Sequence, residues 1–176
     1  MRTTININLN KKGGLENGIK ELEAYKKRVK EKTSLLVQKL TDYGAEIVRI
    51  KIVNMGAYYS GALLSGVDGY YSPTLIAGFV KVASDHVAFV EFGTGVKGQG
   101  TYKNAEYLSK ASWGYVTGGD KGKIFTTKDG RVGWYFPMDD GTWRFTEGMP
   151  SRPFMYETAL ELQRDFQKIT QEVFST

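Results

Sequence analysis

The sequence contains no cysteine and only one histidine, His86. Without cysteine the chain can form neither a disulfide framework nor a thiolate metal site. A single histidine cannot build a typical zinc site, and Glu91, a lone acid in an apolar run, has no second carboxylate with which to work as a glycosidase pair. We therefore expect no catalytic residue, no metal and no cofactor. A small hydrolase that relies on His86 and Glu91 is the least favoured class of function.

Long apolar runs are also missing. No run approaches 18 residues, so the sequence predicts no membrane contact. The first residues, MRTTININLNKK, alternate polar and apolar side chains and lack the apolar segment of a secretory signal, so we expect synthesis in a cytosol. Apolar residues make up 41% of the 176-residue chain, which is enough for a hydrophobic core. We expect one domain over 1–176, with an insertion at 96–149.

A helical period dominates the N-terminal part of the chain. Apolar or aromatic residues recur every seventh position from Leu15 to Ile50, which predicts a helix from about Leu15 to Asn54. The companion positions hold Lys26 and Thr33, so we expect a bend or break near 28–34. Such a helix could form a coiled coil or pack one face against a sheet.

Period-two patterns and turn residues predict the strands. Residues 3–9 alternate as a short strand, and 74–84 and 86–92 are rich in Val, Ile and Phe. The Ser84-Asp85 junction between the last two suggests an antiparallel hairpin, which would place His86 at the start of a strand, near the surface. Residues 60–67, SGALLSGV, should form one short helical turn that directs Leu63, Leu64 and Val67 inward.

The C-terminal third has its own pattern. Three strand-like runs, 123–127, 131–136 and 142–146, are separated by Asp-Gly turns and predict a three-stranded meander. Residues 153–174 carry one apolar stripe with a step of three and four, which predicts a closing helix after Pro153. The fold class is therefore α+β: a small antiparallel sheet packed against long N-terminal helices and a C-terminal helix, with a β-rich insertion.

Three glycines follow the 86–92 run in the pattern G-x-G-x-x-G, at Gly93, Gly95 and Gly98. A dinucleotide site needs this pattern between a strand and a helix of a βαβ unit, where the helix N-terminus binds the pyrophosphate. No apolar helix face long enough to cover a parallel sheet follows here. We interpret these glycines as a sharp turn with close backbone approach at a subunit boundary.

The formal net charge is +5, and part of the excess lies in 96–131, where seven cations stand against three carboxylates. A basic segment of this kind suits DNA phosphates or an acidic partner, and equally a solvated surface. Tyr102, Tyr107, Trp113 and Tyr115 lie among the lysines, so a nucleic-acid-binding module without sequence specificity is the alternative function. The candidate contact residues are Lys97, Lys103, Lys110, Lys121, Lys123, Lys128 and Arg131.

Three stretches, SGALLSGV (60–67), AFVEFGTG (88–95) and PSRPFMYETAL (150–160), occur in this order. They resemble the motifs TG-x-L-x-x-S, Y-x-x-x-V-E-F-G-T and P-x-x-P-F-hydrophobic-x-x-A of the head–tail joining, or tail-completion, proteins of long-tailed double-stranded DNA bacteriophages. The resemblance covers about two thirds of the chain. It departs from the family at Ser60, where threonine is usual, and at 96–149, where the family often has a short loop.

The resemblance implies a structural protein of the virion neck or tail, made in the bacterial host cytoplasm, and no enzyme. It implies a homo-oligomeric ring, a hexamer or dodecamer, that contacts other neck, connector and tail proteins and meets packaged DNA. Rings require head-to-tail interfaces between copies. We expect the motif residues to lie at that interface; they are Glu91, Phe92, Gly93, Thr94, Pro153 and Phe154.

Overall fold

The computed structural model describes residues 4–5, 7, 12–57, 61–103, 125–138 and 140–175. The fold is α+β, as the sequence predicts. The chain forms two compact units, where the sequence predicts one domain. The first unit contains Met1–Ile47, Asp68–Lys81 and Ala159–Thr176, and the second contains Val48–Val67 and Val82–Thr158. Each unit is described by itself below.

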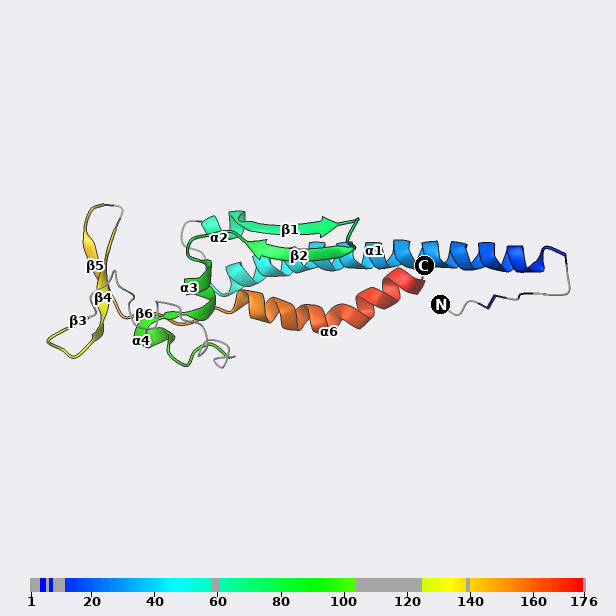
Figure 1. Ribbon diagram of the computed structural model, residues 1–176. Helices are drawn as coiled ribbons and strands as arrows, with labels where there is room; N and C mark the ends of the chain where they lie inside the picture. The colour runs from blue at the N-terminus through cyan, green and yellow to red at the C-terminus, as the bar shows by residue number, and fades with distance from the viewer. Residues whose placement is uncertain are drawn as a thin grey trace. The chain divides into compact units, whose positions relative to one another are not determined.

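The helix α1 runs without interruption from Gly14 to Asn54 (Figure 1). The predicted break near 28–34 is therefore wrong. Residues 26–32 are mostly Lys, Arg and Glu, which are good helix formers. The Thr33 hydroxyl donates to the Val29 carbonyl oxygen at 2.8 Å, within the helix itself. A gap in an apolar stripe weakens packing against a partner, but it leaves the backbone hydrogen bonds intact.

The sheet of the first unit has two strands, β1 (Val67–Ser72) and β2 (Ala77–Val82). The predicted hairpin of 74–84 with 86–92 is wrong, because β2 pairs with the strand before it and Val87–Phe92 form a short helix, α3. A short apolar run has no period that separates a strand from a buried helical turn. The strand expected over 3–9 is also not formed at Thr4, Ile5 and Ile7, the described residues of that range.

Small residues allow the sheet and the last helix, α6 (Phe154–Ser175), to lie close to α1. A Cβ at Gly78 of β2 would come within 1.9 Å of the Thr41 hydroxyl. A Cβ at Gly44 of α1 would meet both Val80 of β2 at 3.1 Å and Leu162 of α6 at 3.2 Å. Within this unit, Figure 1 shows the strands and α6 alongside α1.

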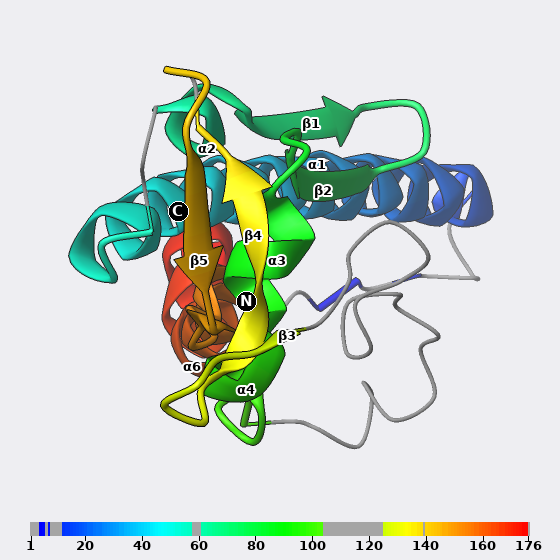
Figure 2. The same ribbon diagram turned by 90° about the vertical axis from the view of Figure 1, so that its left-hand side faces the viewer.

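The second unit contains the remaining short elements: α2 (Ala62–Ser65), α3, α4 (Gly95–Gly98) and the strands β3 (Phe125–Thr126), β4 (Val132–Pro137), β5 (Trp143–Thr146) and β6 (Gly148–Met149). The predicted meander is confirmed, with strand order β3-β4-β5 and antiparallel pairing (Figure 2). Gly130 and Gly141 have positive φ in its two turns. The most buried apolar side chains of this unit are Val48, Ile52, Ala57, Leu63, Val67, Val90 and Phe154.

Candidate functional site

The second and third motifs meet at Glu91. This residue lies on α3 with 5% of its surface exposed, and its carboxylate oxygens accept hydrogen bonds from the backbone N–H groups of Met155 and Tyr156, each at 3.0 Å. These N–H groups belong to the first turn of α6, where a helix leaves its donors without intrahelical partners. Glu91 therefore caps the N-terminus of α6 from 64 residues away in sequence, and its negative charge suits the positive end of the helix dipole.

Two opposing effects act on the acidity of Glu91. Burial raises its pKa above the ordinary value, because an ionised carboxylate loses hydration inside the unit. The N–H groups of Met155, Tyr156 and Phe154 lower it, because they stabilise the anion, but burial is the larger effect. A buried acid with a raised pKa can mark an active site. Here the hydrogen bonds to α6 account for the acid structurally.

The glycines after α3 bring two chain segments together. Thr94 and Gly95 form antiparallel bridges with Met149 and Gly148 of β6. A Cβ at Gly95 would lie 2.4 Å from the Glu147 carbonyl oxygen, and one at Gly148 would lie 1.9 Å from that of Thr94. The G-x-G-x-x-G pattern thus serves close backbone contact within one chain. The interpretation as a turn with close approach is confirmed, while its place at a subunit boundary stays a prediction.

The first motif also has a structural role in this unit. Gly61 precedes α2 with φ 78°, in the left-handed region that favours glycine. Leu63 and Val67 are buried at 6% and 5% exposure, and Leu64 is half-buried, so the predicted inward-facing turn is confirmed. Gly66 lets the chain pass close to Ala83, whose N–H donates to the Gly66 carbonyl oxygen at 2.9 Å.

Burial limits how the predicted interface residues could act. Phe154 is fully buried, and Glu91 and Thr94 are nearly so. Gly93, Pro153 and Phe92 are half-buried, and the Phe92 ring packs edge-on against Tyr102 at 4.9 Å between centroids. The interface role stays a prediction. Residues as buried as Phe154 can support such an interface by holding its shape, but within the described chain they present no surface to a neighbouring copy.

Several of the predicted DNA-contacting cations are paired within the chain. Lys97 lies 3.5 Å from the Glu147 carboxylate, Lys103 lies 2.5 Å from that of Glu157, and Arg131 lies 2.7 Å from that of Asp129. These pairs reduce the charge available to a phosphate backbone. Lys128 is exposed. Lys110, Lys121 and Lys123 lie outside the described residues.

The aromatic residues proposed for base stacking are only partly described, since Tyr107, Trp113 and Tyr115 fall outside the described ranges. Tyr102 packs between Phe92 and Tyr156, with centroid separations of 4.9 and 5.9 Å. Burial raises the pKa of its hydroxyl. The ring is therefore part of an intramolecular aromatic cluster.

His86 is exposed, as expected, but it precedes the helix α3 and does not begin a strand. Its backbone N–H donates to the Ser84 hydroxyl at 3.4 Å, and its ring lies 6.2 Å from that of Phe89. Within the described ranges, no group of three or more His, Cys, Asp or Glu side chains could hold a metal ion. The helices of the described part of the chain also include none with the length and hydropathy to cross a bilayer.

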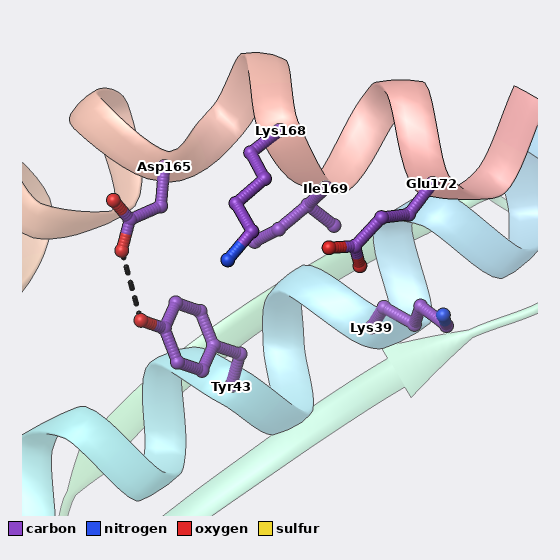
Figure 3. Close-up of a pocket in the computed structure, with 6 residues that line it drawn as sticks. All are labelled: Lys39, Tyr43, Asp165, Lys168, Ile169 and Glu172. Carbon is purple, nitrogen blue, oxygen red and sulfur yellow. Dashed lines mark hydrogen bonds between the residues drawn. The ribbon is translucent and has the colours of Figure 1, made fainter.

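A shallow cleft between α1 and α6 is the other polar feature, and it lies in the first unit (Figure 3). The Tyr43 hydroxyl donates to Asp165 at 2.8 Å. Hydrogen bonds from Arg164 and Tyr43 hold the pKa of Asp165 below its ordinary value, and the same bond to Asp165 raises the pKa of Tyr43. Asp165 therefore stays ionised and Tyr43 protonated near neutral pH. The lining residues are Lys39, Tyr43, Asp165, Lys168, Ile169 and Glu172.

This cleft has a structural explanation, since the Tyr43–Asp165 bond connects α1 to α6 and neither group is poised to exchange a proton at neutral pH. Sequence reasoning missed this bond, as it missed the helix cap at Glu91. The only signal for the cap was a charged residue inside an apolar run. For Tyr43 and Asp165, which are 122 residues apart, the sequence carried no signal.

Comparison of the chain with models of known families, with curated proteins and with solved structures finds no match.

Proposed function

We propose that the protein is a structural subunit of the neck or tail of a bacteriophage or a related tail-like particle, and that it joins the DNA-filled head to the tail. The observation that carries the proposal is that the three motif stretches, at 60–67, 88–95 and 150–160, lie mostly in one compact unit and have structural roles there. A chance match of short motifs would not be expected to select residues that the fold depends on.

Each motif contributes a residue type that its position requires. Gly61 takes a positive φ before α2, and Leu63 is part of the buried set of the unit. Glu91 caps α6, and Phe154 at the start of that helix is fully buried. The three motifs therefore lie on α2, on α3 and at the N-terminus of α6, which we call the α2–α3–α6 junction. A family that shares these motifs would share this junction, which supports the proposed family relation and, through it, the function.

The surface of the β-meander supports a role in assembly. Trp143 is 65% exposed and Tyr135 is 47% exposed, and the Phe125, Tyr135 and Phe145 rings pack edge-to-face across the three strands. Exposed aromatic clusters on a folded protein commonly contact another protein. The departure from the family at 96–149 thus provides a surface for a neighbouring neck or tail protein.

A gene knockout in the particle-producing cell tests this function. With a stop codon early in the gene, we expect filled heads and finished tails to accumulate unjoined, and the intact chain supplied from a plasmid to restore joining. Joined, infectious particles in the absence of the chain would contradict the proposal.

A point variant tests the assembly surface separately. Trp143→Ala should fold normally, since the side chain is mostly exposed, but restore joining poorly. Full restoration would show that the meander surface is not used, and it would leave the knockout result to decide the function.

A further inference from the structure

The apolar stripe along the first half of α1 is largely exposed among the residues that the structure describes. Between Leu15 and Glu31 every residue except Gly18 is exposed. The exposure reaches 57% at Leu15, 47% at Ile19 and 48% at Leu22, and it is 36% at Val29.

The exposed apolar residues continue a stripe that is buried further along the same helix. Leu15, Leu22, Val29 and Leu36 are spaced by seven, and Leu36 is only 8% exposed. This spacing places them along one side of α1. The stripe is thus open from Leu15 to Val29 and buried at Leu36.

The described N-terminal residues cover one flank and the far side of this helix. Ile7 covers Gly18, which follows Leu15 by three residues and precedes Leu22 by four and therefore borders the stripe; an added Cβ at Gly18 would meet the Ile7 side chain at 2.7 Å. Thr4 and Ile5 lie near Glu21, Ala24, Lys27, Arg28 and Glu31, which do not belong to the stripe. The described N-terminal residues, Thr4, Ile5 and Ile7, therefore leave Leu15, Ile19, Leu22 and Val29 exposed.

We propose that this stripe, defined by Leu15, Ile19, Leu22 and Val29, binds the same stripe of a second copy of the chain, and that the two helices run antiparallel. The segment is about 25 Å long at 1.5 Å per residue. Most helices in proteins gain their stability from packing of an apolar face, so a partner helix would stabilise this segment. The interface is an addition to the proposed neck function and does not depend on it.

Charge selects a second copy as the partner and sets its direction. Residues 14–24 carry three carboxylates and one lysine, whereas 25–33 carry five cations and one carboxylate. In an antiparallel pair the acidic turns of one helix lie opposite the basic turns of the other, twice by symmetry. A parallel pair would place like charges side by side, which is unfavourable.

The same charge match sets the register. Centring the pair near Ala24 places Ile19 opposite Val29 of the second copy and Leu22 opposite Lys26. The Lys26 stem can cover apolar surface while its ammonium reaches solvent. A lysine at a core position of a helix pair commonly fixes register at a cost in stability. The lysine that interrupts the stripe thus has a role in the pair.

Sedimentation of the purified full chain over a range of concentrations tests the pairing. We expect reversible dimers, or even-numbered oligomers built from them. Leu22→Lys should raise the dissociation constant of the pair by at least about a hundredfold, because each pair loses two buried leucines and the new lysine lies opposite Lys26 of the second copy. Asn17→Lys adds the same charge off the stripe and should leave association nearly unchanged. Circular dichroism of both variants shows that the helix is kept.

Each other outcome counts against the pairing. A chain that stays monomeric at all soluble concentrations, or a Leu22→Lys variant that associates as tightly as the native chain, would overturn it. A ring held together through the second unit would survive Leu22→Lys, so that result would refute the helix pair and leave the neck function standing.

Cross-linking tests the direction, because the chain has no native cysteine. Glu16→Cys and Lys30→Cys variants are mixed under mild oxidation. An antiparallel pair brings position 16 of one copy near position 30 of the other, so the mixed disulfide should predominate. Predominant 16–16 and 30–30 disulfides would mean parallel helices, and an associated chain that forms none of these would pair elsewhere; either result would overturn the proposal.

Discussion

Replacing Glu91 with alanine removes the side chain that caps the first turn of α6, and it should destabilise the second unit. The carboxylate accepts two N–H bonds, from Met155 and Tyr156, at 3.0 Å each. Hydrogen bonds to a charged group contribute about 1.5–3 kcal/mol each. The dehydration that raises the pKa of Glu91 offsets part of this gain. We therefore expect Glu91→Ala to lower the free energy of unfolding by about 2–4 kcal/mol.

Urea unfolding, followed by circular dichroism and by tryptophan fluorescence, measures this loss. Glu157→Ala is the matched control: Glu157 also lies in the first turn of α6, but it pairs with the exposed Lys103. Exposed ion pairs contribute little, so this control should unfold close to the native midpoint. Equal effects of the two substitutions, or a Glu91→Ala chain as stable as the native one, would refute the capping role.

Three further predictions concern single positions. Gly148→Ala should lower the free energy of unfolding, measured by thermal unfolding, by about 3 kcal/mol or more, since its Cβ would lie 1.9 Å from the Thr94 carbonyl oxygen. Gly141→Ala is the control: Gly141 also has a positive φ but faces open space, so this substitution should cost about 1 kcal/mol. Because burial raises the pKa of Glu91, the native chain should gain stability relative to Glu91→Gln as the pH falls toward 4.5; an opposite slope would contradict this. His86→Gln should leave stability and particle infectivity near normal, whereas lost infectivity with normal folding would indicate a role for the imidazole.

The two long helices, α1 and α6, and the β-meander could be predicted from the sequence because their patterns are local and repeat along the chain. The stripe of α1 extends over five heptads, and α6 and the meander carry equally regular patterns with Asp-Gly turns. The break predicted in α1 was wrong for a physical reason. Lys26 and Thr33 interrupt the face that packs, but both residues are compatible with a helical backbone.

The region around Glu91 could not be predicted in the same way. Residues 87–92 are short and apolar, and such a run can be a strand or a buried helical turn. The choice depends on a partner 64 residues away, the N-terminus of α6. The partner of Glu91 is a pair of backbone N–H groups, for which the sequence carries no local signal. Tyr43 and Asp165 likewise meet only because α1 and α6 pack together.

Electron cryomicroscopy of purified particles that carry this chain tests its proposed function most directly. We predict several copies arranged in a ring around the particle axis at the neck, between the head and the tail, with the density of each copy fitted by the α2–α3–α6 junction. Particles that lack the chain, or that contain it only in the head shell or at the distal end of the tail, would contradict the assignment to the neck.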